Sequence, residues 1–298
     1  MSPRDPIAYL RRIRSYYAVL GYGAPYQWAQ FEDVPFQPLT KPLNQSRLTL
    51  VTTAAPYQPD KGDQGPGAPY NAAAKFFQVY AGETASGPDL RISHLSIDRQ
   101  HTTAEDQNSY FPLPALRRAV AAGRIGAVTP RFFGLPTNRS QRMTIDIDGA
   151  ELVLRMKAEN AGAVILAANC PVCHQSVSLA ARALEAAGIA TVVMGCARDI
   201  VEHVGVPRFL FSDFPLGNAA GRPGDRPSQD LTLGLALDVL EQAEGPRTTF
   251  ASPLEWQSDH SWKLDYCNIE RLSSEEIASR RLEFDKAKSV AQAVRGTS

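Results

Sequence analysis

The fold is decided by the stretch Ala163-Val-Ile-Leu-Ala-Ala168, which runs into Asn169-Cys-Pro-Val-Cys-His174 and then into a helix-forming segment up to Ala187. A short, continuous apolar run bounded in this way is typical of a buried parallel strand. The pattern recurs downstream, with apolar runs at 190–194 and 207–211 and helical segments at 198–204 and 229–243. Alternating strands and helices predict right-handed βαβ units. We therefore expect an α/β fold with a parallel doubly wound sheet and helices on both faces. Whether it is built from two similar α/β lobes stays open.

Outward from this region the patterns are less regular. Helical spacing of apolar residues predicts helices at 7–20, 113–122, 141–161 and 274–294. Apolar or alternating runs predict strands at 48–51 and 90–97, and a strand or loop at 125–133. We divide the chain into an N-terminal α/β lobe with a long Pro/Gly loop (1–135), a C-terminal α/β lobe with the cysteine motif (136–250), and a C-terminal extension and helix (251–298).

Composition excludes several classes of function. The 298 residues include 31 Lys and Arg and 31 Asp and Glu, so the net charge is zero and no broad basic surface for nucleic acid or anionic lipid is expected. No apolar run reaches the roughly 18 residues that a membrane span needs. Charged residues interrupt the first 20 positions, which argues against a signal peptide and predicts a cytoplasmic protein. Four cysteines are too few for a disulfide scaffold and are better explained by chemistry.

Cys170 and Cys173 form a Cys-x-x-Cys motif where the strand gives way to the helix. The partial positive charge of a helix N-terminus stabilises a thiolate, so the pattern predicts a depressed pKa for Cys170, with Cys173 resolving a mixed disulfide. His174 is adjacent and is expected to move a proton. A structural zinc site would need two more ligands, a haem attachment site implies export, and inert buried cysteines are the remaining alternative. We predict neither a metal nor a bound cofactor.

Three further candidate residues follow the next two strands, and two more lie in an earlier segment of the chain. Cys196 comes directly after the run 190–194, and is either close to Cys170 at the same sheet edge or a small buried residue. Gly217 and Asn218 follow the third run and are candidates for binding a substrate carboxylate or carbonyl. His94 and Asp98 share one face of the strand expected at 90–97, as an acid/base pair, as metal ligands or as a structural contact.

The string Cys170-Pro-Val-Cys-His-Gln175 resembles the selenoprotein B family of glycine, sarcosine and betaine reductases and the selenocysteine subunit of D-proline reductase. Matching pieces elsewhere are Tyr16-Tyr-Ala-Val-Leu-Gly-Tyr22, Val51-Thr-Thr-Ala54, His94 with Asp98, and Phe214-Pro-Leu-Gly-Asn218. The resemblance implies reductive cleavage of a C–N bond α to a carbonyl, often after a pyruvoyl group on a partner subunit has activated the amine. It makes Cys170, at the selenocysteine position, the nucleophile, Cys173 the resolving thiol and His174 a nearby proton donor.

A cysteine in place of selenocysteine makes this chain a selenium-free relative with a weaker nucleophile. The expected function is an oxidoreductase that acts on a small amino-acid-like substrate and is recycled by an external thiol reductant. Its expected partner is a reductase subunit or a second copy of the chain. Two alternatives stay open: a cofactor-independent racemase or lyase that uses Cys170 and Cys196, and a non-catalytic redox subunit that docks through the segment with Trp256 and Trp262.

Overall fold

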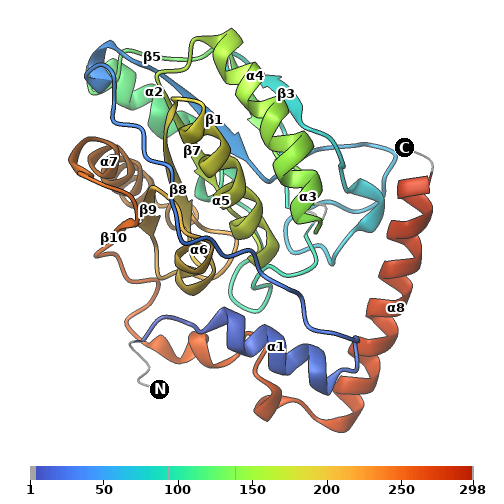
Figure 1. Ribbon diagram of the computed structural model, residues 1–298. Coiled ribbons are helices and arrows are strands. Elements are labelled where there is room, and N and C mark those ends of the chain that lie inside the picture. Colours follow the sequence, from blue (N-terminus) through green and yellow to red (C-terminus); the bar gives the residue numbers. More distant parts are fainter. Residues whose placement is uncertain (1–4, 93, 138, 297–298) are drawn as a thin grey trace.

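The computed structural model describes residues 5–92, 94–137 and 139–296. Its strands are β1 (Arg47–Thr52), β2 (Ala55–Pro56), β3 (Tyr80–Glu83), β4 (Leu90–Arg91), β5 (Ala127–Val128), β6 (Arg131–Gly134), β7 (Ala163–Ala167), β8 (Ala190–Gly195), β9 (Arg208–Phe211) and β10 (Thr248–Ala251). Within the described residues, eight strands form one sheet in the order β10-β9-β8-β7-β1-β6-β3, with β5 also beside β1 (Figure 1). Every pair in it is parallel except β3 with β6.

The helices are α1 (Tyr9–Val19), α2 (Leu113–Ala121), α3 (Gln141–Met143), α4 (Ala150–Glu159), α5 (Pro171–Ala186), α6 (Arg198–Val204), α7 (Arg226–Gln242) and α8 (Ser274–Gly296). A π-helical turn, Thr144–Gly149, joins α3 to α4. Helices α4 and α5 cover one face of the sheet and α2 and α7 the other, while α8 stands at the edge of the molecule (Figure 1). None of the helices in the described part of the chain is long and apolar enough to cross a membrane.

Strand β7 shows why the deciding stretch is apolar throughout. Val164 and Leu166 pack in the cluster under α4 and α5, whereas Ala163 and Ile165 pack in the cluster under α2 and α7. Because a strand covered on both faces has no solvent side, it carries no polar alternation. The predicted α/β class with a mainly parallel sheet is confirmed. The sheet joins strands from both predicted lobes, since β1 is hydrogen-bonded to β7.

The structure differs from the predicted elements mainly at sheet edges. Only Leu90–Arg91 of the strand expected at 90–97 is extended, as β4, and it pairs antiparallel with β2. Residues 94–102 form turns, so His94 and Asp98 do not share a strand face. The predictions also missed the edge strands β3 and β10, whose side chains are partly exposed and carry little apolar signal. Helix α5 begins at Pro171, four residues earlier than expected.

A buried ion pair fixes α5 to the sheet. Arg208 on β9 donates to Glu185 on α5 at 2.7 Å, and both side chains are almost fully buried. The extended segment 24–42 crosses the same helix, where the Ala29 N–H donates to Gln175 Oε1 at 2.7 Å and the Gln37 carbonyl accepts from Arg208 at 2.8 Å. Helix α5 is therefore held near its start through Gln175 and near its end through Glu185.

Candidate functional site

The two cysteines lie in what we call the cysteine junction, residues 168–175, where β7 ends and α5 begins. Cys170 is the N-cap residue of α5, with an extended backbone, and its Sγ accepts a hydrogen bond from the Cys173 N–H at 3.2 Å. Pro171 starts the helix at a position where no N–H is needed. One helical turn therefore brings the two predicted redox residues together.

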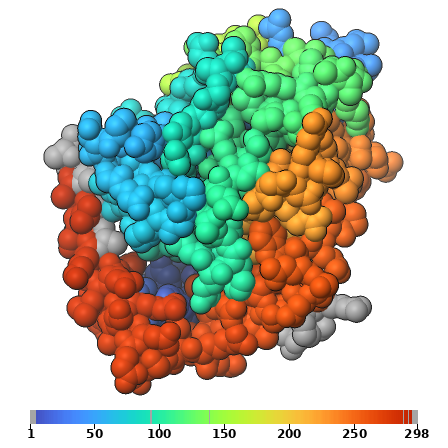
Figure 2. Space-filling view, turned by 180° about the vertical axis from the view of Figure 1, so that it is seen from behind, coloured from blue at the N-terminus to red at the C-terminus, as the bar shows by residue number. Residues whose placement is uncertain are grey.

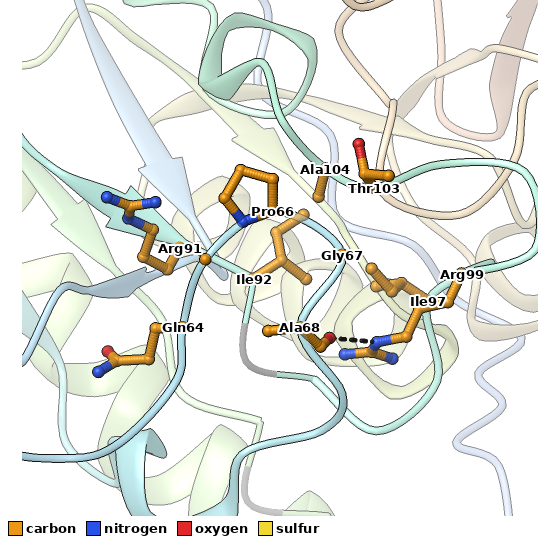
Figure 3. A pocket seen from close by; sticks show the side chains of 11 residues that line it. Gln64, Pro66, Gly67, Ala68, Arg91, Ile92, Ile97, Arg99, Thr103 and Ala104 are labelled. Atoms are coloured by element: carbon orange, nitrogen blue, oxygen red, sulfur yellow. Dashed lines mark hydrogen bonds between the residues drawn. The ribbon is translucent and has the colours of Figure 1, made fainter.

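His94 joins the cysteines from a segment that we call the histidine loop, residues 92–104. The sulfur atoms of Cys170 and Cys173 and one imidazole nitrogen of His94 all lie within 4.8 Å of one another. The His94 side chain is buried, and its Nδ1 atom has no hydrogen-bond partner among the described residues. Arg99 holds the loop in place by donating to the carbonyls of His94, at 2.6 Å, and of Ala68, at 2.9 Å (Figure 3).

The pKa values of the two thiols shift in opposite directions. Burial and the adjacent Cys173 sulfur raise the pKa of the Cys170 thiol well above its usual value. Burial opposes ionisation of Cys173 as well, but hydrogen bonds from Cys170, His94 and Thr53 hold the pKa of Cys173 well below its usual value. We had expected the depressed pKa at Cys170. The helix N-terminus favours an anion there, but a pair this close shares one proton, and the additional donors surround Cys173.

His174 is placed differently from His94. Its Nδ1–H donates to the Cys170 carbonyl at 2.7 Å, and its Nε2 accepts from the N–H groups of Cys196 at 2.8 Å and Ala197 at 3.1 Å. Burial lowers the pKa of His174 to about 4, so the ring is neutral at physiological pH. Gly195 permits this contact, because a Cβ there would lie 2.6 Å from the ring. His174 thus ties the end of β8 to the cysteine junction.

The remaining candidate residues at the edge of the sheet contact neighbouring loops and not the sulfur pair. Cys196 lies in the apolar cluster of α2 and α7, not in the one that contains Cys170, and burial raises its pKa to about 12. Asn218 is fully buried, accepts a hydrogen bond from Thr102 of the histidine loop at 3.3 Å and donates to a carbonyl of its own loop. A Cβ on Gly217 would lie 3.6 Å from Thr102. This loop therefore packs against the histidine loop.

Asp98 belongs to a second cluster on the same loop. Its carboxylate contacts Nδ1 of His101 at 3.0 Å, and Nε2 of His101 contacts Asp265 at 3.1 Å. Burial raises the pKa of Asp98. The predicted pairing of His94 with Asp98 is thus replaced by an Asp98–His101–Asp265 chain that connects the histidine loop to the segment before α8.

A large cavity opens next to Cys170. It has a volume of about 1670 Å³ and is lined by α1, α8, the histidine loop and Cys170. Figure 2 shows the hollow between α8, in red, and the light-blue and cyan loops, with dark-blue N-terminal residues at its base. A separate pocket beside Arg99 and Gly67 has only about 10 Å³, which is room for about one water molecule (Figure 3). The large cavity is therefore the candidate substrate site.

Sequence reasoning assigned no specific role to three side chains of this site, although Thr53 lies in a segment of the resemblance and Arg139 is one of six arginines of which one could hold a carboxylate. Thr53 follows β1, the strand next to β7, and its hydroxyl accepts from the Asn169 backbone N–H at 3.2 Å and side-chain amide at 3.1 Å. Lys75 and Arg139 line the cavity. The rule that parallel strands end at one sheet edge identifies Thr53 once β1 is placed beside β7. No sequence signal singles out Lys75 or Arg139.

Comparison with known proteins gives a consistent picture. The D-proline reductase subunit gamma of Acetoanaerobium sticklandii is 30% identical over 223 residues, which cover 74% of this chain and 88% of that protein. Glycine reductase complex component B subunit gamma is 24% identical over 198 residues in Carboxydothermus hydrogenoformans and 23% identical over 230 residues in Symbiobacterium thermophilum. The matches cover 64% and 76% of this chain but only 44% and 52% of those two proteins.

No protein-family model matches the chain, and no solved structure is similar to it. The identity and coverage of the D-proline reductase subunit nevertheless confirm the resemblance drawn from the cysteine motif and its companions. The chain belongs to the selenoprotein B-type family of reductase-complex gamma subunits.

Proposed function

We propose that this chain is a reductase subunit in which Cys170 and Cys173 reductively cleave a C–N or similar bond of a small amino-acid-like substrate. One observation carries the proposal: a cavity-lining sulfur, Cys170, sits against a fully buried sulfur, Cys173, with a buried histidine beside them. An accessible thiol with a buried partner is the arrangement that an attacking and a resolving cysteine need.

The proposed reaction balances without a bound cofactor. The Cys170 sulfur, as a thiolate, attacks the carbon that bears the protonated amine, so that an S–C bond forms, the C–N bond breaks and the neutral amine leaves with the proton that it already carries. The Cys173 thiolate then attacks the Cys170 sulfur; the disulfide forms, the S–C bond breaks and the carbon fragment takes a proton. One dithiol is oxidised to a disulfide for each C–N bond reduced to C–H and N–H. An external dithiol reductant, itself oxidised, restores the pair.

The opposite pKa shifts assign roles to the neighbouring groups. The pKa of Cys170 is raised and that of Cys173 is lowered, so we propose that the resting pair keeps its proton on Cys170 and its negative charge on Cys173. Cys173 is thus the base that draws the proton from Cys170 as it attacks. His94 is within reach of both sulfurs, accepts that proton before Cys173 resolves the adduct, and delivers it to the carbon fragment. His174, with both ring nitrogens engaged, positions the junction instead.

Charge and volume suggest the substrate and how it arrives. Lys75 places positive charge near Cys170, and Arg139 stacks over Tyr26 on the cavity wall at 5.5 Å. These cations match a carboxylate. The cavity exceeds the roughly 300–1,000 Å³ of ordinary small-molecule sites. We propose that a partner subunit enters it and presents the activated amine, as subunit names among the relatives suggest.

The test is thiol labelling with iodoacetamide, read by intact mass from about pH 5 to about pH 9. We expect label on Cys170 in the reduced protein, labelling of Cys170 at lower pH in Cys173→Ser because the neighbouring sulfur raises the pKa of Cys170, and a Cys170–Cys173 disulfide that blocks labelling of both after mild oxidation. Cys267→Ser, at another cavity-lining cysteine, is the matched control. Failure of the Cys170–Cys173 disulfide to form after mild oxidation would contradict the proposal. Disulfide cycling without amine cleavage in the assembled complex would instead identify a non-catalytic redox subunit.

A further inference from the structure

We infer that His94, Cys170 and Cys173 form a binding site for one thiophilic divalent cation of the Zn²⁺ class, with a fourth coordination position open to the cavity. The inference goes beyond the proposed reductase function and does not rest on it, because the site requires only reduced thiols. The sequence showed two of these ligands and predicted no metal. The histidine loop supplies the third ligand from about 75 positions upstream of the motif.

The spacing of the three ligand atoms suits such a cation. Tetrahedral zinc, with Zn–S bonds of about 2.3 Å, holds two sulfurs about 3.8 Å apart. The atoms here lie within 4.8 Å of one another, so a closure of about 1 Å or less completes the set. Two thiolates and an imidazole are the ligands of a zinc site that keeps an open position.

Two unpartnered buried atoms support a bound cation here. His94 Nδ1 and Asn169 Oδ1 are both buried without a hydrogen-bond partner among the described residues; His94 is one of the three ligands and Asn169 is the residue next to Cys170. His174, the histidine next to Cys173, has both nitrogens engaged and is excluded as a ligand. Buried polar atoms without partners are uncommon and mark places where an ion or water belongs.

The surroundings also favour an anionic ligand set. The Cys173 sulfur accepts hydrogen bonds from Cys170 and Thr53, and Thr53 is itself fixed by Asn169. Such supporting contacts orient ligands and tune a metal site. Binding displaces the remaining thiol proton. It also excludes the disulfide, since both sulfurs are then ligands. A bound cation is therefore a reversible block of the thiol chemistry that the external reductant does not relieve.

The test is an anaerobic titration of the reduced full chain with Co²⁺, followed by displacement with Zn²⁺. We expect one Co²⁺ per chain, with a sulfur-to-cobalt charge-transfer band and the visible bands of four-coordinate Co²⁺. Both should vanish on adding Zn²⁺, and neither should form in the oxidised protein. His94→Ala and Cys173→Ser should weaken binding by more than about 100-fold, beyond what loss of a supporting residue causes. Cys267→Ser and His203→Asn, which leave the three ligands intact, should bind normally.

Retention of full affinity in His94→Ala, with the fold verified by circular dichroism, would overturn the site, because the cation would then be held by the dithiol alone. Absence of the charge-transfer band in the reduced wild type would also overturn it. Failure of the proposed function leaves a different signature: Co²⁺ binds with three ligands, but the Cys170–Cys173 disulfide does not form. A disulfide that cycles in a protein that binds no Co²⁺ would reject this inference alone.

Discussion

The cysteine junction and the histidine loop meet at the same three atoms but are held by different forces. The junction is the end of a central strand and the start of a helix, and a buried ion pair fixes that helix to β9. The histidine loop has no helix or strand between 94 and 102 and is held by hydrogen bonds of Arg99 and Thr102 and by the Asp98–His101–Asp265 chain. The site therefore pairs a rigid sulfur side with an adjustable nitrogen side.

This difference separates the residues that determine global stability from those that determine the chemistry of the site. Damage to the junction is expected to cost global stability, because the sheet and α5 unfold together. Damage to the loop is expected to shift the position of His94, and with it the charge on Cys173, at a small cost in stability. Each of the following variants changes one side of the site.

The largest effect is expected on the junction side, from Arg208→Met. The change leaves Glu185 buried on α5 without its cationic partner, although Thr191 still donates to it. Removing one member of a buried ion pair costs about 3–5 kcal/mol. We expect a loss of this size in the free energy of unfolding, measured by urea denaturation at neutral pH. Arg198→Met, which breaks an exposed pair on α6, is the control and should change stability by less than about 1 kcal/mol.

The pH dependence sharpens this prediction. Burial raises the pKa of Glu185, and loss of Arg208 raises it further. Protonation of a carboxyl that is costly to bury charged is favoured by folding, so the deficit of Arg208→Met should shrink as the pH falls towards about 5. A deficit that is constant with pH would show that the lost contribution is packing rather than charge.

His174 gives the next largest effect. Its pKa of about 4 lies below the value of about 6.5 in an unfolded chain, so the unfolded state binds the proton first. Stability is therefore expected to fall by up to about 3 kcal/mol as the pH drops from about 6.5 to about 4. His174→Gln should lack this loss. The urea midpoint of the wild type should therefore fall relative to that of the variant as the pH drops. An equal pH slope in both proteins would show that His174 is already charged in the fold.

The contrast between the junction and the loop also explains which parts of the fold and the site the sequence predicts. Continuous apolar runs predicted β7, β8 and β9, because a strand buried on both faces has no other pattern available. Cys170 and Cys173 were found because a helix N-terminus after such a strand limits where they lie. The place of His94 was not predictable from 90–97, since it depends on contacts of its loop with Ala68 and Asn218, which belong to distant segments. The motif predicted proton transfer by His174 because it does not show that the N–H groups of Cys196 and Ala197 donate to the ring.

A smaller effect is expected on the loop side, from Gly217→Ala. Gly217 has φ of +113°, a backbone conformation that side chains rarely adopt, whereas the space around a new Cβ is ordinary. The expected cost is about 1–3 kcal/mol of backbone strain. If the strain moves the histidine loop, iodoacetamide labelling of Cys170 should also slow. Gly234→Ala, in the middle of α7 with open space around it, should instead stabilise by about 1 kcal/mol and leave labelling unchanged.

The smallest change in stability, and the sharpest test of how the two sides meet, is expected from Thr53. Its hydroxyl donates to the Cys173 sulfur and accepts from Asn169, so Thr53→Val removes a donor from the thiolate. A hydrogen bond to a charged group stabilises it by about 1.5–3 kcal/mol, so its loss predicts a rise in the pKa of Cys173. Thr53→Ser keeps the hydroxyl and should behave as wild type. The pH midpoint of the thiolate absorbance in a Cys170→Ser background measures the shift, and equal midpoints in the Val and Ser variants would assign the low pKa of Cys173 to His94 instead.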